Sequence, residues 1–210
     1  MKKYNLKTVL SLFIVILFAQ INYGQTVTIG TQVWTSKNLD VSTFRNGEPI
    51  PQAKTDEEWK AAGNNQKPAW CYYDNDASNG TKYGKLYNWY AVNDPRGLAP
   101  NGFHIPTEKE WTQLTDYLGG ESGAGTKMKS TSGWNNNGNG TNSSGFSGRP
   151  GGGRDFNGIF FNIVDFGYWW SSASNALDFA WGHYLSYDNG DVYRNNGYME
   201  NGVSVRCLKD

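Results

Sequence analysis

The sequence predicts an α+β domain with small antiparallel sheets, two short helices and a long loop region rich in glycine and asparagine. Three observations lead to this prediction. Short runs that alternate apolar and polar residues stand at the start of the domain and through its last third. Two capped amphipathic segments lie between them. The 210 residues include 26 glycines but only 18% charged residues, which is untypical of coiled coils and disordered acidic chains.

Residues 1–24 have the pattern of a secretory signal peptide. Lys2, Lys3 and Lys7 precede an apolar run over 9–19, and Gly24 is a small residue suited to cleavage. The alternative, a membrane anchor, needs about 20 apolar residues, which is more than this run supplies. The segment contains no cysteine for lipid attachment. We therefore expect residues 26–210 to be secreted, periplasmic or associated with the cell surface, without a membrane span after processing.

The charge balance argues against nucleic acid as a partner. The chain has 19 basic and 19 acidic residues, and loss of the three leader lysines leaves a net charge of −3. Binding to phosphate backbones requires a basic face, which this balance does not favour.

Export permits a disulfide between the two cysteines, Cys71 and Cys207. Closing a loop of that length would stabilise the domain by about 4 to 5 kcal/mol in the chain-entropy description. Two buried free thiols are the alternative.

The first elements expected are a hairpin and a short helix. Residues 26–34 alternate β-branched and polar side chains around Gly30, as in a hairpin or bent strand. Thr55 and Glu58 have the spacing of a capping box before Trp59, and Gly63 can end that helix.

The clearest helix signal follows Pro106. Thr107 and Glu110 form a second capping-box pattern, and Trp111, Leu114 and Leu118 share one helical face. The stripe predicts packing on a sheet, with Trp111 in the core rather than in a ligand site.

Residues 119–158 are predicted to form a long, ordered loop region anchored by Trp134, Phe146 and Phe156. Within it, glycines 151–153 suggest a flexible turn. Arg154 and Asp155 suggest an ion pair that organises the loop.

The last third predicts an antiparallel sheet with strands near 168–172, 180–187, 192–194 and 202–207. Asn189 and Gly190 are the strongest hairpin signal. Trp169 and Trp170 are adjacent, so in a strand they face opposite ways, and we expect one of them in the core.

These motifs resemble a known family. The segments that carry the resemblance are YGKLYNWYAV (83–92), GLAPNGFHIPTEKEW (97–111), GRDFNG (153–158), GYWWSS (167–172) and GVSVRC (202–207). In this order they are similar to the Fibrobacter succinogenes major paralogous domain. The resemblance implies a C-type lectin-like fold, shared with formylglycine-generating sulfatase-modifying enzymes, in exported or surface proteins without an established activity. Fold alone leaves the function open.

No catalytic constellation is visible, so we do not expect an enzyme. Chemistry of the formylglycine-generating type requires thiols in a pocket, whereas Cys207 lies in a strand-like segment. His104 is expected to have a structural role before the second helix. GxSxG and HExxH patterns are absent from the sequence.

A metal site is one interpretation of the segment 74–80. Asp74, Asp76 and Asn79 supply oxygen ligands of the kind that Ca²⁺ prefers, with Gly80 for a turn. An ordinary turn explains the same residues. No cofactor is required by any other motif.

The hairpin of the last third is the best candidate binding site. Aromatic rings and amides suit sugars, because a pyranose has an apolar C–H face and a rim of hydroxyls. Half of these side chains would be core in a one-sided sheet. We therefore predict an exported, non-enzymatic module that binds glycans or surface polymers; a structural or protein-interaction module of an envelope assembly is the alternative, and an enzyme is third. The candidate residues are Trp181, Tyr184, Tyr187, Asn189, Asp191, Tyr193 and Arg194.

Overall fold

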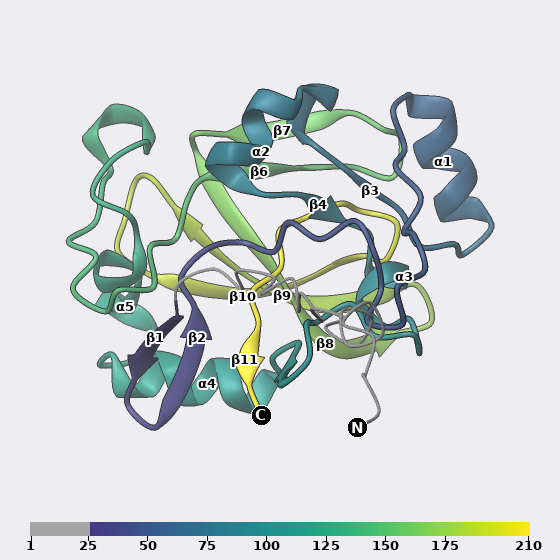
Figure 1. Cartoon of the computed structure of the whole chain (residues 1–210). Helices are drawn as coiled ribbons and strands as arrows, with labels where there is room; N and C mark the ends of the chain where they lie inside the picture. The colour runs from purple at the N-terminus through teal and green to yellow at the C-terminus, as the bar shows by residue number, and fades with distance from the viewer. Residues whose placement is uncertain (1–25) are drawn as a thin grey trace, which may run out of the picture.

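A computed structural model describes residues 26–210 and contains five helices among eleven strands (Figure 1). The helices are α1 (Asp56–Asn64), α2 (Ala77–Tyr83), α3 (Trp89–Val92), α4 (Glu108–Tyr117) and α5 (Glu121–Met128). The strands are β1 (Thr26–Ile29), β2 (Gln32–Thr35), β3 (Trp70–Cys71), β4 (Leu86–Tyr87), β5 (Phe103–His104), β6 (Gly151–Arg154), β7 (Phe160–Ile163), β8 (Phe166–Ala176), β9 (Phe179–Ser186), β10 (Val192–Tyr198) and β11 (Leu208–Lys209). The α+β class is confirmed, and the expectation of two helices is wrong.

Both ends of the described chain meet in a four-stranded sheet with the order β1-β2-β11-β5. The expected hairpin forms around Gly30, whose φ of 62° lies in the left-handed region that favours glycine. Leu208 of β11 pairs with Trp34 on one side and His104 on the other. Figure 1 shows α4 running beneath this sheet.

The second sheet has five strands in the order β10-β9-β8-β6-β7, and all pairs are antiparallel except β6 with β8. The hairpin of β9 and β10 is confirmed, and the loop that contains Asn189 and Gly190 connects its strands. Leu185 pairs with Val192, and neither Asn189 nor Gly190 has a positive φ. The backbone N–H of Thr126 in α5 donates to the Gly190 carbonyl, so contacts with α5 help to hold the loop.

The two predicted helix starts are confirmed. Thr55 and Thr107 each accept a hydrogen bond from the backbone N–H three residues later, at 3.2 and 3.3 Å. At the second site Glu110 completes the capping box by accepting from the backbone of Thr107. Trp111 and Leu114 are fully buried, as the stripe predicted.

Residues 119–158 contain more regular structure than expected. α5 and β6 both lie in this region, and Trp134 and Phe146 are buried anchors, whereas Phe156 is 45% exposed. The glycines of β6 form a buried strand instead of a flexible turn. A Cβ at Gly152 would lie 2.4 Å from the carbonyl oxygen of Phe161, so close strand packing requires glycine there.

Arg154 does not pair with Asp155. Its guanidinium is fully buried and forms an ion pair with Asp56 at 2.8 Å. Asp155 instead accepts hydrogen bonds from the backbone N–H groups of Asn157 and Ile159. The ion pair of Arg154 with Asp56 therefore links β6 to α1, whereas the predicted pair would have joined two neighbouring residues of one loop.

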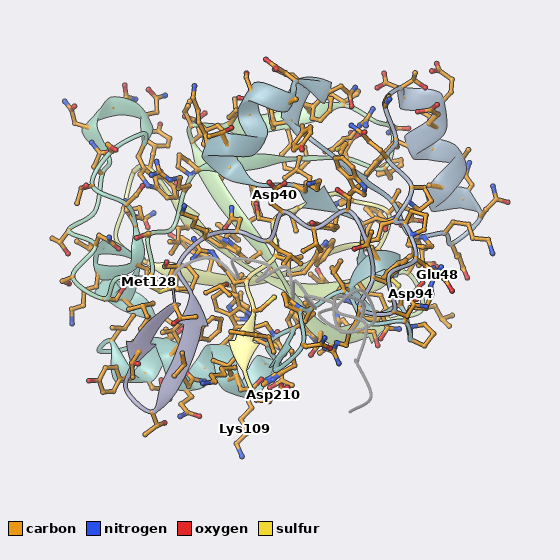
Figure 2. The ribbon with its side chains drawn as sticks, in the orientation of Figure 1. Asp40, Glu48, Asp94, Lys109, Met128 and Asp210 are labelled. Atoms are coloured by element: carbon orange, nitrogen blue, oxygen red, sulfur yellow. The ribbon has the colours of Figure 1, made fainter. Side chains whose placement is uncertain are left out.

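The five-stranded sheet has core on both faces. Trp169 packs with Trp34 and Trp111 on one face, and Trp170 packs with Tyr87 and other residues on the opposite face. Both indoles are buried, so the expectation that only one would be core is wrong. Side chains from both layers lie in the space between them (Figure 2).

The cysteines are free thiols, and the expected disulfide is corrected. Cys71 lies in a small cluster with Trp59 and Leu86, whereas Cys207 lies in the larger cluster with Trp170. Burial raises the pKa of each thiol to about 12. The predicted signal peptide, residues 1–24, lies outside the described residues. Within residues 26–210, no helix combines the length and apolar character needed to cross a membrane.

Candidate functional site

A row of three tyrosines crosses one face of the five-stranded sheet. Tyr168, Tyr184 and Tyr193 stand directly opposite one another on β8, β9 and β10. The ring centroids of Tyr168 and Tyr184 are 5.7 Å apart. Those of Tyr184 and Tyr193 are 4.7 Å apart, with an interplanar angle of 11°. Cross-strand pairing therefore arranges the three rings side by side.

Two phenylalanines extend this row to form what we call the aromatic face: Phe161, Phe166, Tyr168, Tyr184 and Tyr193. The rings of Phe161 and Phe166 each lie 5.6 Å from the ring of Tyr168. All five side chains are partly exposed. The rings thus hold one another in place while they remain accessible to a ligand.

Asparagines orient two of the tyrosine hydroxyls. The side-chain amide of Asn162 donates to the hydroxyl of Tyr168 at 2.8 Å, and that of Asn189 donates to Tyr193 at 2.9 Å. Each hydroxyl oxygen thereby accepts one bond and keeps its own proton to donate. Burial raises the pKa of Tyr168 and Tyr184, so both phenols stay protonated at neutral pH.

A cavity of about 210 Å³ adjoins this face, and its lining includes Phe161, Tyr168, Tyr184 and the polar residues Asn195 and Asn201. Gly182 lies between Trp170 and Asn195 in the strand register and leaves the floor open, because it has no side chain. The buried Oδ1 of Asn201 has no hydrogen-bond partner within residues 26–210. The cavity therefore combines apolar rings with amides, as a site for a polar organic ligand requires.

The comparisons with known proteins identify a family. Residues 27–209 match the family described as Fibrobacter succinogenes major domain. The chain belongs to this family. No curated protein and no solved structure matches it.

In this Fibrobacter succinogenes major domain, the predicted binding residues do not share one face of the five-stranded sheet. Tyr184 and Tyr193 belong to the aromatic face, and Asn189 orients Tyr193. Trp181 and Arg194 lie on the opposite face, where the guanidinium carbon is 3.5 Å from the centroid of the indole ring. The sequence signal could not separate these sets, because the face of each residue depends on the strand register.

Tyr187 and Asp191 shape the loop between β9 and β10. Tyr187 packs against the core cluster of Trp111, and its backbone N–H donates to the carbonyl of Asp165 at 2.9 Å. The backbone N–H of Asp191 donates to the side chain of Asn189. Tyr187 therefore contributes to the core, whereas Asp191 contributes to the loop through its backbone.

Phe161, Phe166 and Tyr168 were not among the predicted binding residues. Phe161 and Phe166 flank the turn between β7 and β8, in a segment with no clear alternation. Tyr168 stands beside Trp169, whose inward position implies that Tyr168 faces the other way. The opposite orientation of neighbouring residues in a strand could have assigned Tyr168 to the aromatic face. The sequence does not show which tryptophan packs against α4, so this assignment could not be made.

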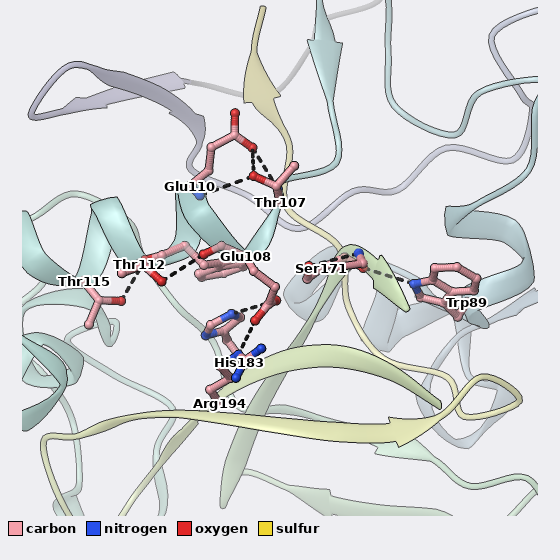
Figure 3. Close-up of polar contacts among 11 residues, drawn as sticks. Trp89, Thr107, Glu108, Glu110, Thr112, Thr115, Ser171, His183 and Arg194 are labelled. Carbon is pink, nitrogen blue, oxygen red and sulfur yellow. Dashed lines mark hydrogen bonds and ion pairs between the residues drawn. The ribbon is translucent and has the colours of Figure 1, made fainter. Parts of the chain in front are cut away.

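A polar network occupies the face opposite the aromatic face (Figure 3). Glu108, the first residue of α4, accepts from His183 at 3.3 Å and also from Arg194. Burial favours a higher pKa, but bonds from His183, Arg194 and Ser171 lower the pKa of Glu108 to about 2. The His183 ring stacks on Trp111 at 4.6 Å. The network fastens α4 to three strands.

This network lacks the order of a catalytic triad. In a serine nucleophile site the imidazole lies between the hydroxyl and the carboxylate. Here the carboxylate of Glu108 lies between Ser171 and His183. His104, the second histidine, contacts Glu110 at 2.9 Å and Asp210 at 2.8 Å, and its structural role stays a prediction.

The proposed calcium ligands have local roles at α2. Asp76 Oδ1 caps the helix by accepting from the backbone N–H of Ser78 at 2.8 Å, and Oδ2 accepts from the Ser78 hydroxyl at 2.8 Å. The amide of Asn79 donates to the carbonyl of Tyr73 at 3.0 Å. No group of three or more His, Cys, Asp or Glu side chains suited to a metal ion occurs in the described part of the chain.

Proposed function

We propose that this domain is an exported, non-enzymatic binding module that recognises glycans or cell-surface polymers through the aromatic face. The observation that carries the proposal is the row of Tyr168, Tyr184 and Tyr193 beside a cavity with asparagine side chains. Aromatic rings suit the apolar C–H face of a pyranose, and oriented hydroxyls and amides suit its hydroxyl rim.

The finer fold assignment belongs to the same proposal. We infer a C-type lectin-like architecture, related to sulfatase-modifying enzymes, from the resemblance of the motifs. The mixture of five helices with small sheets supports it. Export rests on the pattern of the leader, residues 1–24.

The absence of an enzymatic role is also part of the proposal. Formylglycine-generating chemistry needs an accessible thiolate, whereas burial raises the pKa of both Cys71 and Cys207 to about 12. This supports the binding role over the enzymatic alternative.

One observation favours the second candidate function, a structural or protein-interaction module. Leu177, in the turn between β8 and β9, is 93% exposed. Phe179 and Tyr198 lie nearby with ring centroids 4.6 Å apart, and Phe156 contacts Tyr198 at 5.2 Å. An exposed apolar patch of this kind suits an envelope protein partner.

The test is retention of residues 26–210 on a panel of immobilised polysaccharides, with calcium or with a chelator. The variants Tyr184→Ala and Tyr193→Ala should each lower the affinity for a retained polymer about tenfold, because each removes a stacking platform. Tyr117→Ala is the matched control, since Tyr117 is 66% exposed on α4.

Each outcome distinguishes the candidates. Retention that depends on calcium would support a lectin and make Asp74 and Asp76 the first candidate ligands to substitute, and retention unchanged by the chelator would leave the aromatic face as the whole site. Equal retention of Tyr184→Ala and the parent domain would contradict the proposal. Capture of an envelope protein that Leu177→Ser abolishes would support the interaction module.

A further inference from the structure

A second cavity, of about 440 Å³, lies away from the aromatic face, between the segment after β2, the end of α2 and the segment before β6. Asp40, an exposed residue, lines it, and its label in Figure 2 marks the place of the cavity below α2. We call this cavity the basic pocket, because four cationic side chains line it. They are Lys37, Lys82, Arg149 and Arg206.

Arg206 is a buried cation without a carboxylate partner. It is 1% exposed, and its guanidinium donates only to neutral oxygens. The acceptors are Asn38 Oδ1 at 2.7 Å and the carbonyls of Thr35 at 2.6 Å, Phe146 at 2.8 Å and Ser147 at 3.1 Å. Of the five N–H groups of a guanidinium, one is left over by these four bonds. The positive charge therefore persists at the base of the pocket.

Three other cations of the described residues are buried, and two of them have carboxylate partners; the third, Lys129, donates to the carbonyls of Ser186 at 3.0 Å and Asn189 at 2.7 Å. Arg154, which is also fully buried, pairs with Asp56 at 2.8 Å. Lys85 pairs with Asp40 at 2.6 Å. Buried charges are ordinarily paired in this way. Arg206 has no such partner in the part of the chain that the structure describes, so the compensating anion is not supplied from residues 26–210.

The cations at the sides of the pocket increase this imbalance. Lys37, Lys82 and Arg149 are exposed, and none of them forms an ion pair within residues 26–210. Burial, with the nearby charge of Arg149, lowers the pKa of Arg206 to about 9, so the group remains protonated at neutral pH. Asp40, the carboxylate in the lining, is already paired with Lys85. Like charges converge here although the domain without its leader is net acidic.

We propose that the basic pocket binds an oxyanion group, which is a carboxylate, sulfate or phosphate carried by a ligand. Arg149 is the contacting fork, since a guanidinium matches planar and tetrahedral oxyanions with two parallel hydrogen bonds. Lys37 and Lys82 flank the anion, and Arg206 supplies the fixed charge beneath it. The proposal does not depend on the aromatic face or on glycan binding there.

The experiment is a titration of ¹⁵N-labelled residues 26–210 with sodium phosphate and, separately, sodium sulfate, followed by NMR at constant ionic strength set with sodium chloride. We expect saturable shifts at the Nε–H groups of Arg149 and Arg206 and at the backbone amides of 36–38 and 147–149. Lys37→Gln and Arg149→Gln, which alter exposed side chains, should each weaken binding about tenfold.

Lys109→Gln is the matched control, because Lys109 is exposed on α4 and projects from the lower edge in Figure 2, away from Asp40. Its affinity for both anions should equal that of the parent. Absence of saturable shifts would overturn the proposal, and so would shifts that Arg149→Gln leaves unchanged, which would indicate an adventitious ion only. The same titration with sodium acetate, an oligogalacturonate and a sulfated oligosaccharide then identifies the source of the oxyanion. Tighter binding of either oligosaccharide than of the free anions would indicate an acidic polymer.

Discussion

Glu108 connects four elements through one carboxylate. It begins α4 and accepts from Ser171, His183 and Arg194, which lie on β8, β9 and β10. A carboxylate at the first turn of a helix is also stabilised by the helix dipole. This side chain therefore contributes to stability only in its charged form, and its effect must depend on pH.

Glu108→Gln should lower the free energy of unfolding at pH 7 by about 1 to 2 kcal/mol, allowing for solvent screening of a partly exposed group. The pKa of Glu108 falls from an ordinary 4.5 to about 2 on folding, so the unfolded chain binds the proton more tightly. The contribution is complete above pH 4.5 and is lost as the pH falls towards 2. Urea unfolding at pH 7, 4 and 2.5 measures it.

Glu57→Gln is the control for this prediction. Glu57 also lies in the first turn of a helix, α1, but it is exposed. Its substitution should change stability by less than about 0.5 kcal/mol. A difference between Glu108→Gln and the parent that persists at pH 2.5 would show that packing, not charge, accounts for the loss.

The thiols give a second prediction at the residue scale. Because burial raises the pKa of Cys71 and Cys207 to about 12, neither should react with Ellman's reagent in the native domain at pH 8. In guanidinium without reductant, both should react. If the denatured domain does not react with the reagent, the two cysteines are paired in the native protein, and the free thiols of the structure are wrong.

At the scale of elements, local signals determined what could be predicted. The starts of α1 and α4 follow from Thr55 and Thr107, whose hydroxyls bond within three residues of the chain. β6 has no such signal. Its run of glycines is typical of a turn, but it pairs with β7 and β8, and glycine is required at position 152 because Phe161 on β7 leaves no space for a side chain. The sequence around β6 does not show this need for glycine, because it comes from the neighbouring strand β7.

Gly152→Ala tests this account of β6. The substitution adds a methyl group 2.4 Å from the carbonyl oxygen of Phe161, at a φ of 60° that alanine adopts poorly. Overpacking and backbone strain together should lower the free energy of unfolding by about 3 kcal/mol. Gly133→Ala is the control, because Gly133 has a φ of 97° with open space around it, so strain alone should cost about 1 kcal/mol. Equal losses in chemical denaturation would contradict the packing explanation.

At the scale of the whole molecule, the sheet of β8, β9 and β10 decides which residues meet. The sequence predicted the hairpin and its aromatic residues, including Tyr184 and Tyr193 of the candidate site. It could not assign Trp181 and Arg194 to the opposite face, since a shift of one residue in register reverses every side chain. The contribution of Phe161 required the long-range placement of β7.

Trp169 and Trp170 join the two large core clusters across this sheet, so we expect the domain to unfold as one cooperative unit. Trp169→Leu and Trp170→Leu should each lower the free energy of unfolding by about 2 to 4 kcal/mol, because each leaves a cavity in one cluster. Far-UV circular dichroism and tryptophan fluorescence should report the same midpoint in both variants. Trp181→Leu, at a half-buried position of the same sheet, should cost about 1 kcal/mol. Two separate transitions in Trp169→Leu would mean that the faces fold independently, and the sheet would then not transmit stability between them.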